Sequence, residues 1–214
     1  MKERFKILLA HDGSECANGM LADLQRAGLP RKAEAHVLSV YAEWLPAVTS
    51  FGMVETRLND VVSADERETL GIARRARAIL LSIFPDWEVH AEAYAGSPAR
   101  VILQRAEDLQ PDLILVGSHG RSAWGRLFLG SVSQKVLHAA RTTVRIARGR
   151  EVEPGTPIRL LVGVDGSSDA QAAIKAIAQR PWPAGSEARI VHGLPTFPPV
   201  TDQITMTEYV EWMT

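Results

Sequence analysis

Two short glycine-containing segments, separated by nine residues, carry residue types that bind phosphate. The first segment, residues 117–120, reads Gly-Ser-His-Gly, and the second, residues 130–133, reads Gly-Ser-Val-Ser. Glycines let backbone N–H groups approach an anion without a side-chain clash. The second segment opens an expected helix, whose unpaired N–H groups and dipole favour negative charge. The two segments therefore predict a phosphate site.

Two charged residues can complete this site. Arg121 follows the first segment and can add positive charge, and Asp12 can accept hydrogen bonds from a ribose or a base. The familiar motifs are not found: residues 120–127 lack the Lys-Ser/Thr of a P-loop, and no Gly-x-Ser-x-Gly nucleophile elbow is present. His119 has no carboxylate placed to orient it, so we expect no general base.

Apolar runs that alternate with amphipathic patterns indicate the elements that position these segments. Near-continuous apolar strands between helices are typical of a parallel sheet covered on both faces. The order predicts an α/β fold with a doubly wound, five-stranded parallel sheet of the Rossmann-like type. Strands are expected at residues 5–10, 35–41, 89–93, 113–116 and 143–147, and helices at residues 14–27, 63–84, 97–109 and 131–140.

The expected sheet determines where a ligand binds. In an open parallel sheet, the ligand lies beyond the carboxyl ends of the strands, where the strand order reverses. The first and fourth strands meet there, and their ends carry residues 10–12 and 117–121. Arginine is rare in a fully buried strand. We therefore expect the fifth strand to be a sheet edge, with Arg145 reaching solvent or a partner.

The chain contains an internal repeat with an offset of 153 residues. Residues 12–14 and residues 165–167 both read Asp-Gly-Ser, and the offset holds without a gap across strand, helix and strand. Such repeats define the organisation of a chain. The second copy ends in an acidic tail and has no glycine segments, so we expect it to bind no nucleotide by itself. The expected organisation is a first domain at residues 1–148, a linker at residues 149–157 and an incomplete β-α-β copy at residues 158–214.

The composition is that of an ordinary globular protein. Lys and Arg number 24 and Asp and Glu number 25, which gives no basic excess for a nucleic-acid partner. Cys16 is the single cysteine, which excludes an internal disulfide framework and points to a reducing compartment. No stretch approaches the ~18 apolar residues of a membrane helix. We expect a cytoplasmic protein with neither a nucleic-acid nor a membrane partner.

The histidines do not follow a metal-binding pattern along the chain. The six are scattered, and no Cys-x-x-Cys or His-Glu-x-x-His motif pairs any of them. A structural zinc site usually shows such a spacing in the sequence. We therefore expect no zinc site.

On these motifs the sequence resembles the universal stress protein family. Nucleotide-binding members of that family carry Gly-x2-Gly-x9-Gly-Ser/Thr, and residues 117–131 match this spacing without adjustment. The resemblance covers residues 1–148 and restarts near residue 157. Three further segments are similar to the family: Asp-Gly-Ser at residues 12–14, Gly-Ser-Pro at residues 96–98 and Pro-Asp-Leu-Ile at residues 111–114.

The resemblance implies ATP in the crevice of a fold of the adenine nucleotide alpha hydrolase type. A Mg²⁺ or Mn²⁺ ion is then held mainly through the phosphates. Asp12 and Val40 flank the adenosine end, with Ala10 beside them, and the glycine segments hold ribose and phosphates. The implied binding residues are Ala10, Asp12, Val40, Gly117, Ser118, His119, Gly120, Arg121, Gly130, Ser131, Val132 and Ser133.

The implied function is that of an ATP-binding stress-response or signalling module with little or no turnover. Members of the family usually pair through the fifth strand, and the second copy stops before its own. We therefore expect a homodimer through residues 143–147. Two alternatives stay open. The chain can be a slow ATP hydrolase or nucleotide-transforming enzyme, or it can be an interaction protein that binds no nucleotide.

Overall fold

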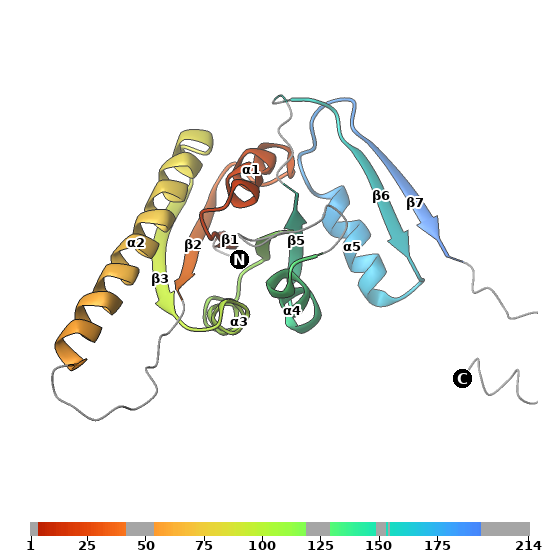
Figure 1. Ribbon diagram of the computed structural model, residues 1–214. Helices are drawn as coiled ribbons and strands as arrows, with labels where there is room; N and C mark the ends of the chain where they lie inside the picture. The colour runs from red at the N-terminus through yellow and green to blue at the C-terminus, as the bar shows by residue number, and fades with distance from the viewer. Residues whose placement is uncertain (1–3, 42–53, 119–128, 149–152, 154, 194–214) are drawn as a thin grey trace, which may run out of the picture. The chain divides into compact units, whose positions relative to one another are not determined.

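The structure is a computed structural model of the 214-residue chain, shown in Figure 1. It describes residues 4–41, 54–118, 129–148, 153 and 155–193. The chain divides into two compact units. The first unit comprises Met1–Ile158 with Arg180–Gly185, and the second comprises Arg159–Gln179 with Ser186–Thr214.

In the first unit, strands and helices alternate in the expected order. The elements are β1 (Phe5–Ala10), α1 (Glu15–Asp23), β2 (Ala33–Tyr41), α2 (Val54–Ile83), β3 (Glu88–Ala95), α3 (Pro98–Leu109), β4 (Leu113–Gly117), α4 (Ser131–Ala139) and β5 (Thr143–Ala147). A single 3₁₀ turn, Leu24–Arg26, follows α1. Helix α2 begins nine residues before the expected start at residue 63, and the apolar residues Val54, Leu58 and Val61 continue its helical spacing back to that start.

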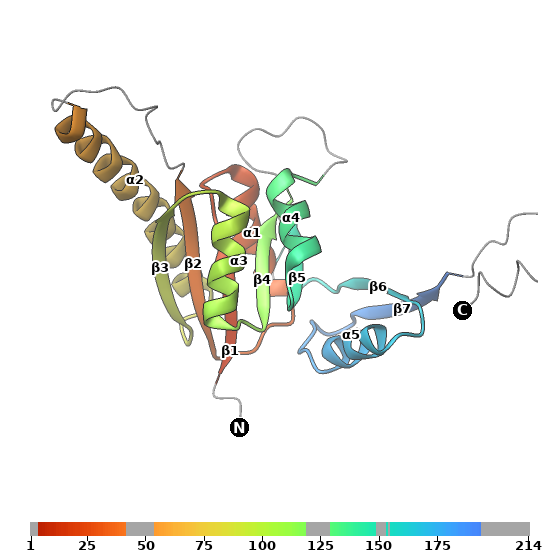
Figure 2. The same ribbon diagram turned by 90° about the horizontal axis from the view of Figure 1, so that it is seen from below.

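The five strands form one parallel sheet in the order β3-β2-β1-β4-β5, which confirms the predicted fold class. Helices α3 and α4 cover one face and α1 and α2 cover the other (Figure 2). Alternate residues of β1 enter the two cores. Ile7 and Leu9 pack with α1 and α2, whereas Leu8 packs with α3 and α4. The central strands are therefore buried on both faces, as their apolar sequences predict.

The described residues of the second unit form a β-α-β element. It consists of β6 (Arg159–Val164), α5 (Ser168–Ala178) and β7 (Glu187–His192), and the two strands pair in parallel. Ser167 caps α5 by accepting a hydrogen bond from Ala170 N, just as Ser14 caps α1 by accepting one from Ala17 N. The exposed fractions of Leu161 and Ile190 are 72% and 60%. Two strands and one helix leave apolar surface uncovered.

The described helices include none that is both long and apolar enough to cross a membrane.

Strand β5 is the edge of the described sheet, as expected, but the expectation for Arg145 needs correction. Its Nη2 donates to Asp23 Oδ2 of α1 at 2.5 Å, so the guanidinium is paired within the same chain. The side chains of Arg145 and Asp23 are 27% and 21% exposed. The sequence could not predict this ion pair, because 122 residues separate Asp23 from Arg145.

Asp23→Asn is expected to lower the free energy of unfolding by about 1–3 kcal/mol, because it leaves a half-buried guanidinium without its charged partner. Asp86→Asn is the matched control. Asp86 pairs with Arg31, whose side chain is 91% exposed, and such pairs contribute about 0.2–1 kcal/mol. Urea unfolding of both variants measures the difference, and equal losses would contradict the prediction.

Candidate nucleotide site

A pocket of about 200 Å³ lies at the carboxyl ends of β1 and β4. The register that pairs Ile7 with Leu113 and Leu9 with Leu115 brings these two ends together. Strand order reverses at this point, which is where open α/β sheets bind ligands. The pocket is lined by Ala10, His11, Asp12, Ala17, Leu38, Val40, Pro98, Ile102, Val116, Gly117, Gly130, Ser131, Val132 and Ser133.

The structure brings most of the predicted binding residues to this pocket. Those from β1 and β2 (Ala10, Asp12, Val40), Gly117, and those from the start of α4 (residues 130–133) all line it. Ser118 lies behind it, fully buried, with its N–H donating to Ala147 O and its carbonyl accepting from Gly130 N. Three further predicted residues, His119, Gly120 and Arg121, lie outside the described residues.

A tight turn after β1 positions Asp12. Gly13 has a φ of +79°, a conformation that L side chains rarely adopt. Asp12 Oδ1 accepts from Ser14 N at 3.0 Å, so the carboxylate is fixed against its own turn. The turn is also attached to β2, because His11 N donates to Leu38 O and Ser39 Oγ donates to His11 O. Asp12 therefore reaches the pocket from a rigid support.

The opposite wall is the N-terminus of α4. Gly130 is its N-cap residue and provides no side-chain cap. The first-turn N–H groups of residues 131–133 have no partner within the helix, and such groups bind anions. Ser133 Oγ donates to Gly117 O at 2.6 Å, which ties the end of β4 to the helix. The hydroxyl of Ser133 therefore positions the site, while backbone N–H groups remain the donors for a ligand.

His11 contributes a neutral imidazole to the pocket wall. Gly13 N donates to its Nδ1 at 3.2 Å, which assigns the ring proton to Nε2. That nitrogen is buried and has no partner among the described residues. Burial lowers the pKa of His11, and the charge of Asp12 acts in the opposite direction.

Sequence reasoning missed His11 and the apolar pocket residues Ala17, Leu38, Pro98, Ile102 and Val116. Apolar residues that form the floor of a pocket have the same sequence pattern as core residues. Only their position at the strand ends distinguishes them, and that position follows from the register of the sheet.

The lowered pKa of His11 makes one contribution to acid sensitivity. The unfolded chain takes up a proton on His11 below about pH 6.5, while the folded chain does so only at lower pH. The free energy of unfolding of the wild type, relative to that of His11→Asn, is therefore expected to be lower at pH 5.5 than at pH 7.5. Urea unfolding at both pH values checks this. The exposed His138→Asn is the control, and a relative stability that rises on acidification would refute the prediction.

Comparisons with known proteins agree with this fold. The sequence model of the universal stress protein family matches residues 3–148. A universal stress protein of Thermus aquaticus is 34% identical over 143 residues, which cover 66% of this chain and 97% of that protein. The YxiE universal stress protein of Bacillus subtilis is 32% identical over 149 residues, covering 67% and 98%. The chain belongs to the universal stress protein family.

Solved structures show the same fold. The structure of the protein MJ0577 has a TM-score of 0.58 at 25% identity, covering 70% of this chain and 99% of that one. A universal stress protein from Archaeoglobus fulgidus has a TM-score of 0.59 at 23% identity, and it covers 97% of this chain and 72% of its own. The similarity to the Archaeoglobus fulgidus protein therefore extends beyond the first unit.

Proposed function

We propose that the protein binds ATP in the pocket at the ends of β1 and β4 and acts as a nucleotide-dependent stress-response module. The observation that carries the proposal is the pairing of two walls across one pocket. Asp12 offers a carboxylate for ribose or base hydroxyl and amino groups, and the N-terminus of α4 offers N–H donors for phosphate. Family membership and the spacing of residues 117–131 support the same ligand.

The pocket fits the two ends of a nucleotide differently. Ala10, Val40 and Ile102 provide an apolar surface suited to the faces of a base. The phosphates then lie over α4, where a Mg²⁺ or Mn²⁺ ion is held mainly by phosphate oxygens. Among the described ionisable side chains of the pocket, His11 has its Nδ1 occupied by Gly13 N, and Asp12 Oδ1 accepts from Ser14 N. We therefore propose little or no turnover.

Mg-ATP is expected to raise the melting temperature of the protein. Ligand at 100 times its dissociation constant stabilises by about 2.7 kcal/mol, and each kcal/mol moves the midpoint by roughly 2–4 °C at this length. Gly130→Asp should abolish the shift. Gly130 has φ −62° and ψ 155°, so aspartate fits there as an N-cap, and its carboxylate both occupies the first-turn N–H groups and repels phosphate.

Gly130→Asn is the matched control, since asparagine also caps the helix but carries no charge. We expect it to retain part of the shift that aspartate removes. The absence of any shift, together with purified protein that carries no nucleotide, would sink the proposal and favour the interaction-protein alternative. Multiple turnover that is lost in Asp12→Ala or His119→Ala would instead establish the enzymatic alternative.

We also propose that two chains pair through β5, whose outer edge has no strand partner in the described sheet. Ala147 O accepts from Ser118 N on the side of β4. The backbone N–H and C=O groups of successive residues point to opposite sides of a strand. Because those of Ala147 face β4, the N–H of Ile146 faces the outer edge of β5. The second unit is, in this proposal, a partial second copy of the family domain.

Sedimentation should show a dimer at tens of micromolar, and Ile146→Pro should convert it to a monomer. Proline removes one outward N–H and is tolerated on an edge strand, so the β4–β5 ladder is retained. Ile146→Val is the control that keeps the dimer. A wild-type protein that is purely monomeric at this concentration would rule out pairing through β5.

A further inference from the structure

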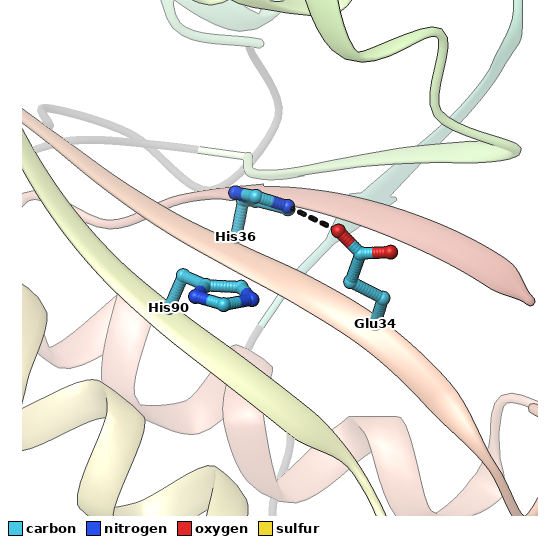
Figure 3. Close-up of side chains that lie close together, drawn as sticks. All are labelled: Glu34, His36 and His90. Carbon is cyan, nitrogen blue, oxygen red and sulfur yellow. Dashed lines mark hydrogen bonds and ion pairs between the residues drawn. The ribbon is translucent and has the colours of Figure 1, made fainter.

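A second cluster of chemically active side chains lies on β2 and β3, near the start of these strands. Parallel pairing places His36 opposite His90, and Glu34 two residues before His36 on the same face. The imidazole rings stack with centroids 4.7 Å apart. Figure 3 shows the carboxylate of Glu34 at the edge of the His36 ring, joined by a hydrogen bond. One ligand atom from each of the three residues lies within 4.8 Å of the other two.

We propose that Glu34, His36 and His90 form a binding site for a divalent transition-metal ion of the zinc class. Two imidazole nitrogens and one carboxylate oxygen are a donor set that such ions favour, whereas Mg²⁺ and Ca²⁺ favour oxygen ligands alone. Three protein ligands leave a fourth position for water. The proposal departs from the sequence-based expectation of no zinc site, because the ligands come from two strands rather than from one local motif.

The ring of His36 is held as a metal ligand requires. Its Nδ1 lies 2.7 Å from Glu92 Oε1, and its Nε2 faces Glu34 Oε1 at 2.9 Å. Arg105 of α3 in turn holds the other oxygen of Glu92, at 2.6 Å from its Nη2. Histidines that bind metals commonly have their second nitrogen hydrogen-bonded to a carboxylate in this way. Glu92 is thus a positioning residue, and the Nε2 of His36 is the ligand atom.

Charge selects Glu34 among the neighbouring carboxylates. Glu92 pairs with Arg105, and Glu88 pairs with Arg4, although its second oxygen also lies 3.4 Å from Nε2 of His90. The hydrogen-bond partner of Glu34 is His36 itself. Metal binding would replace the proton between His36 and Glu34. Tetrahedral ligands around zinc are about 3.4 Å apart, so the cluster has to contract. His90 and Glu34 can move, since their side chains are 43% and 23% exposed.

The test uses the full chain, stripped of metal with a chelator and shown by absorbance to be free of nucleotide. Co²⁺ titration followed by visible ligand-field bands, with displacement by Zn²⁺, should give one equivalent bound. Glu34→Gln and His90→Asn should each weaken the affinity at least 10-fold. Glu92→Gln should weaken it 10–100-fold, as expected for a positioning residue.

Two controls make the result specific to this cluster. Asp86→Asn removes an exposed carboxylate that pairs with Arg31, and His138→Asn removes an exposed histidine of α4, so both should keep wild-type affinity. The proposal is overturned if no single saturable equivalent binds, or if Glu34→Gln and Asp86→Asn bind alike. Thermal melting of each metal-free variant confirms folding. Because the assay contains no nucleotide, its outcome does not depend on ATP binding.

Discussion

The parallel register between β1 and β4 is the constraint on which the rest of the structure depends. Leu8 and Ile114 face one core and Leu9 and Leu115 face the other, and all four are fully buried. A slip by one residue would exchange the residues between the two faces and misalign both cores. The register also determines where the strands end. The pocket is thus a consequence of core packing, since it lies where this pairing stops.

The walls of the pocket are stabilised by local hydrogen bonds rather than by further apolar burial. Ser39 Oγ holds the carbonyl of His11, and Ser133 Oγ holds the carbonyl of Gly117. Each bond attaches one strand end to a neighbouring element. The hydroxyls of Ser39 and Ser133 are committed in this way, and the proposed ligand groups beside them are the backbone N–H donors of α4 and the carboxylate of Asp12.

The sequence was sufficient for the features that depend on local pattern. Apolar runs predicted all five strands, and serine with a nearby helix stop signal predicted α1 and its cap at Ser14. Features that depend on distant pairing were not predictable. The ion pair of Arg145 with Asp23 and the stacking of His36 on His90 both join residues that only the folded sheet brings together. The start of α2 was placed nine residues late although Val54, Leu58 and Val61 already have helical spacing in the sequence.

Helix α3 connects the two candidate sites. Pro98 and Ile102 line the pocket at one end of the helix, and Arg105 holds Glu92, and through it His36, further along. These positions are spaced by four and three residues, so they lie on one face of the helix. The apolar packing of that face on Leu8 and Leu38 fixes how the helix is rotated. One packing interface therefore determines the geometry of both sites, and a substitution that rotates α3 would displace the floor of the pocket and the support of the histidine cluster together.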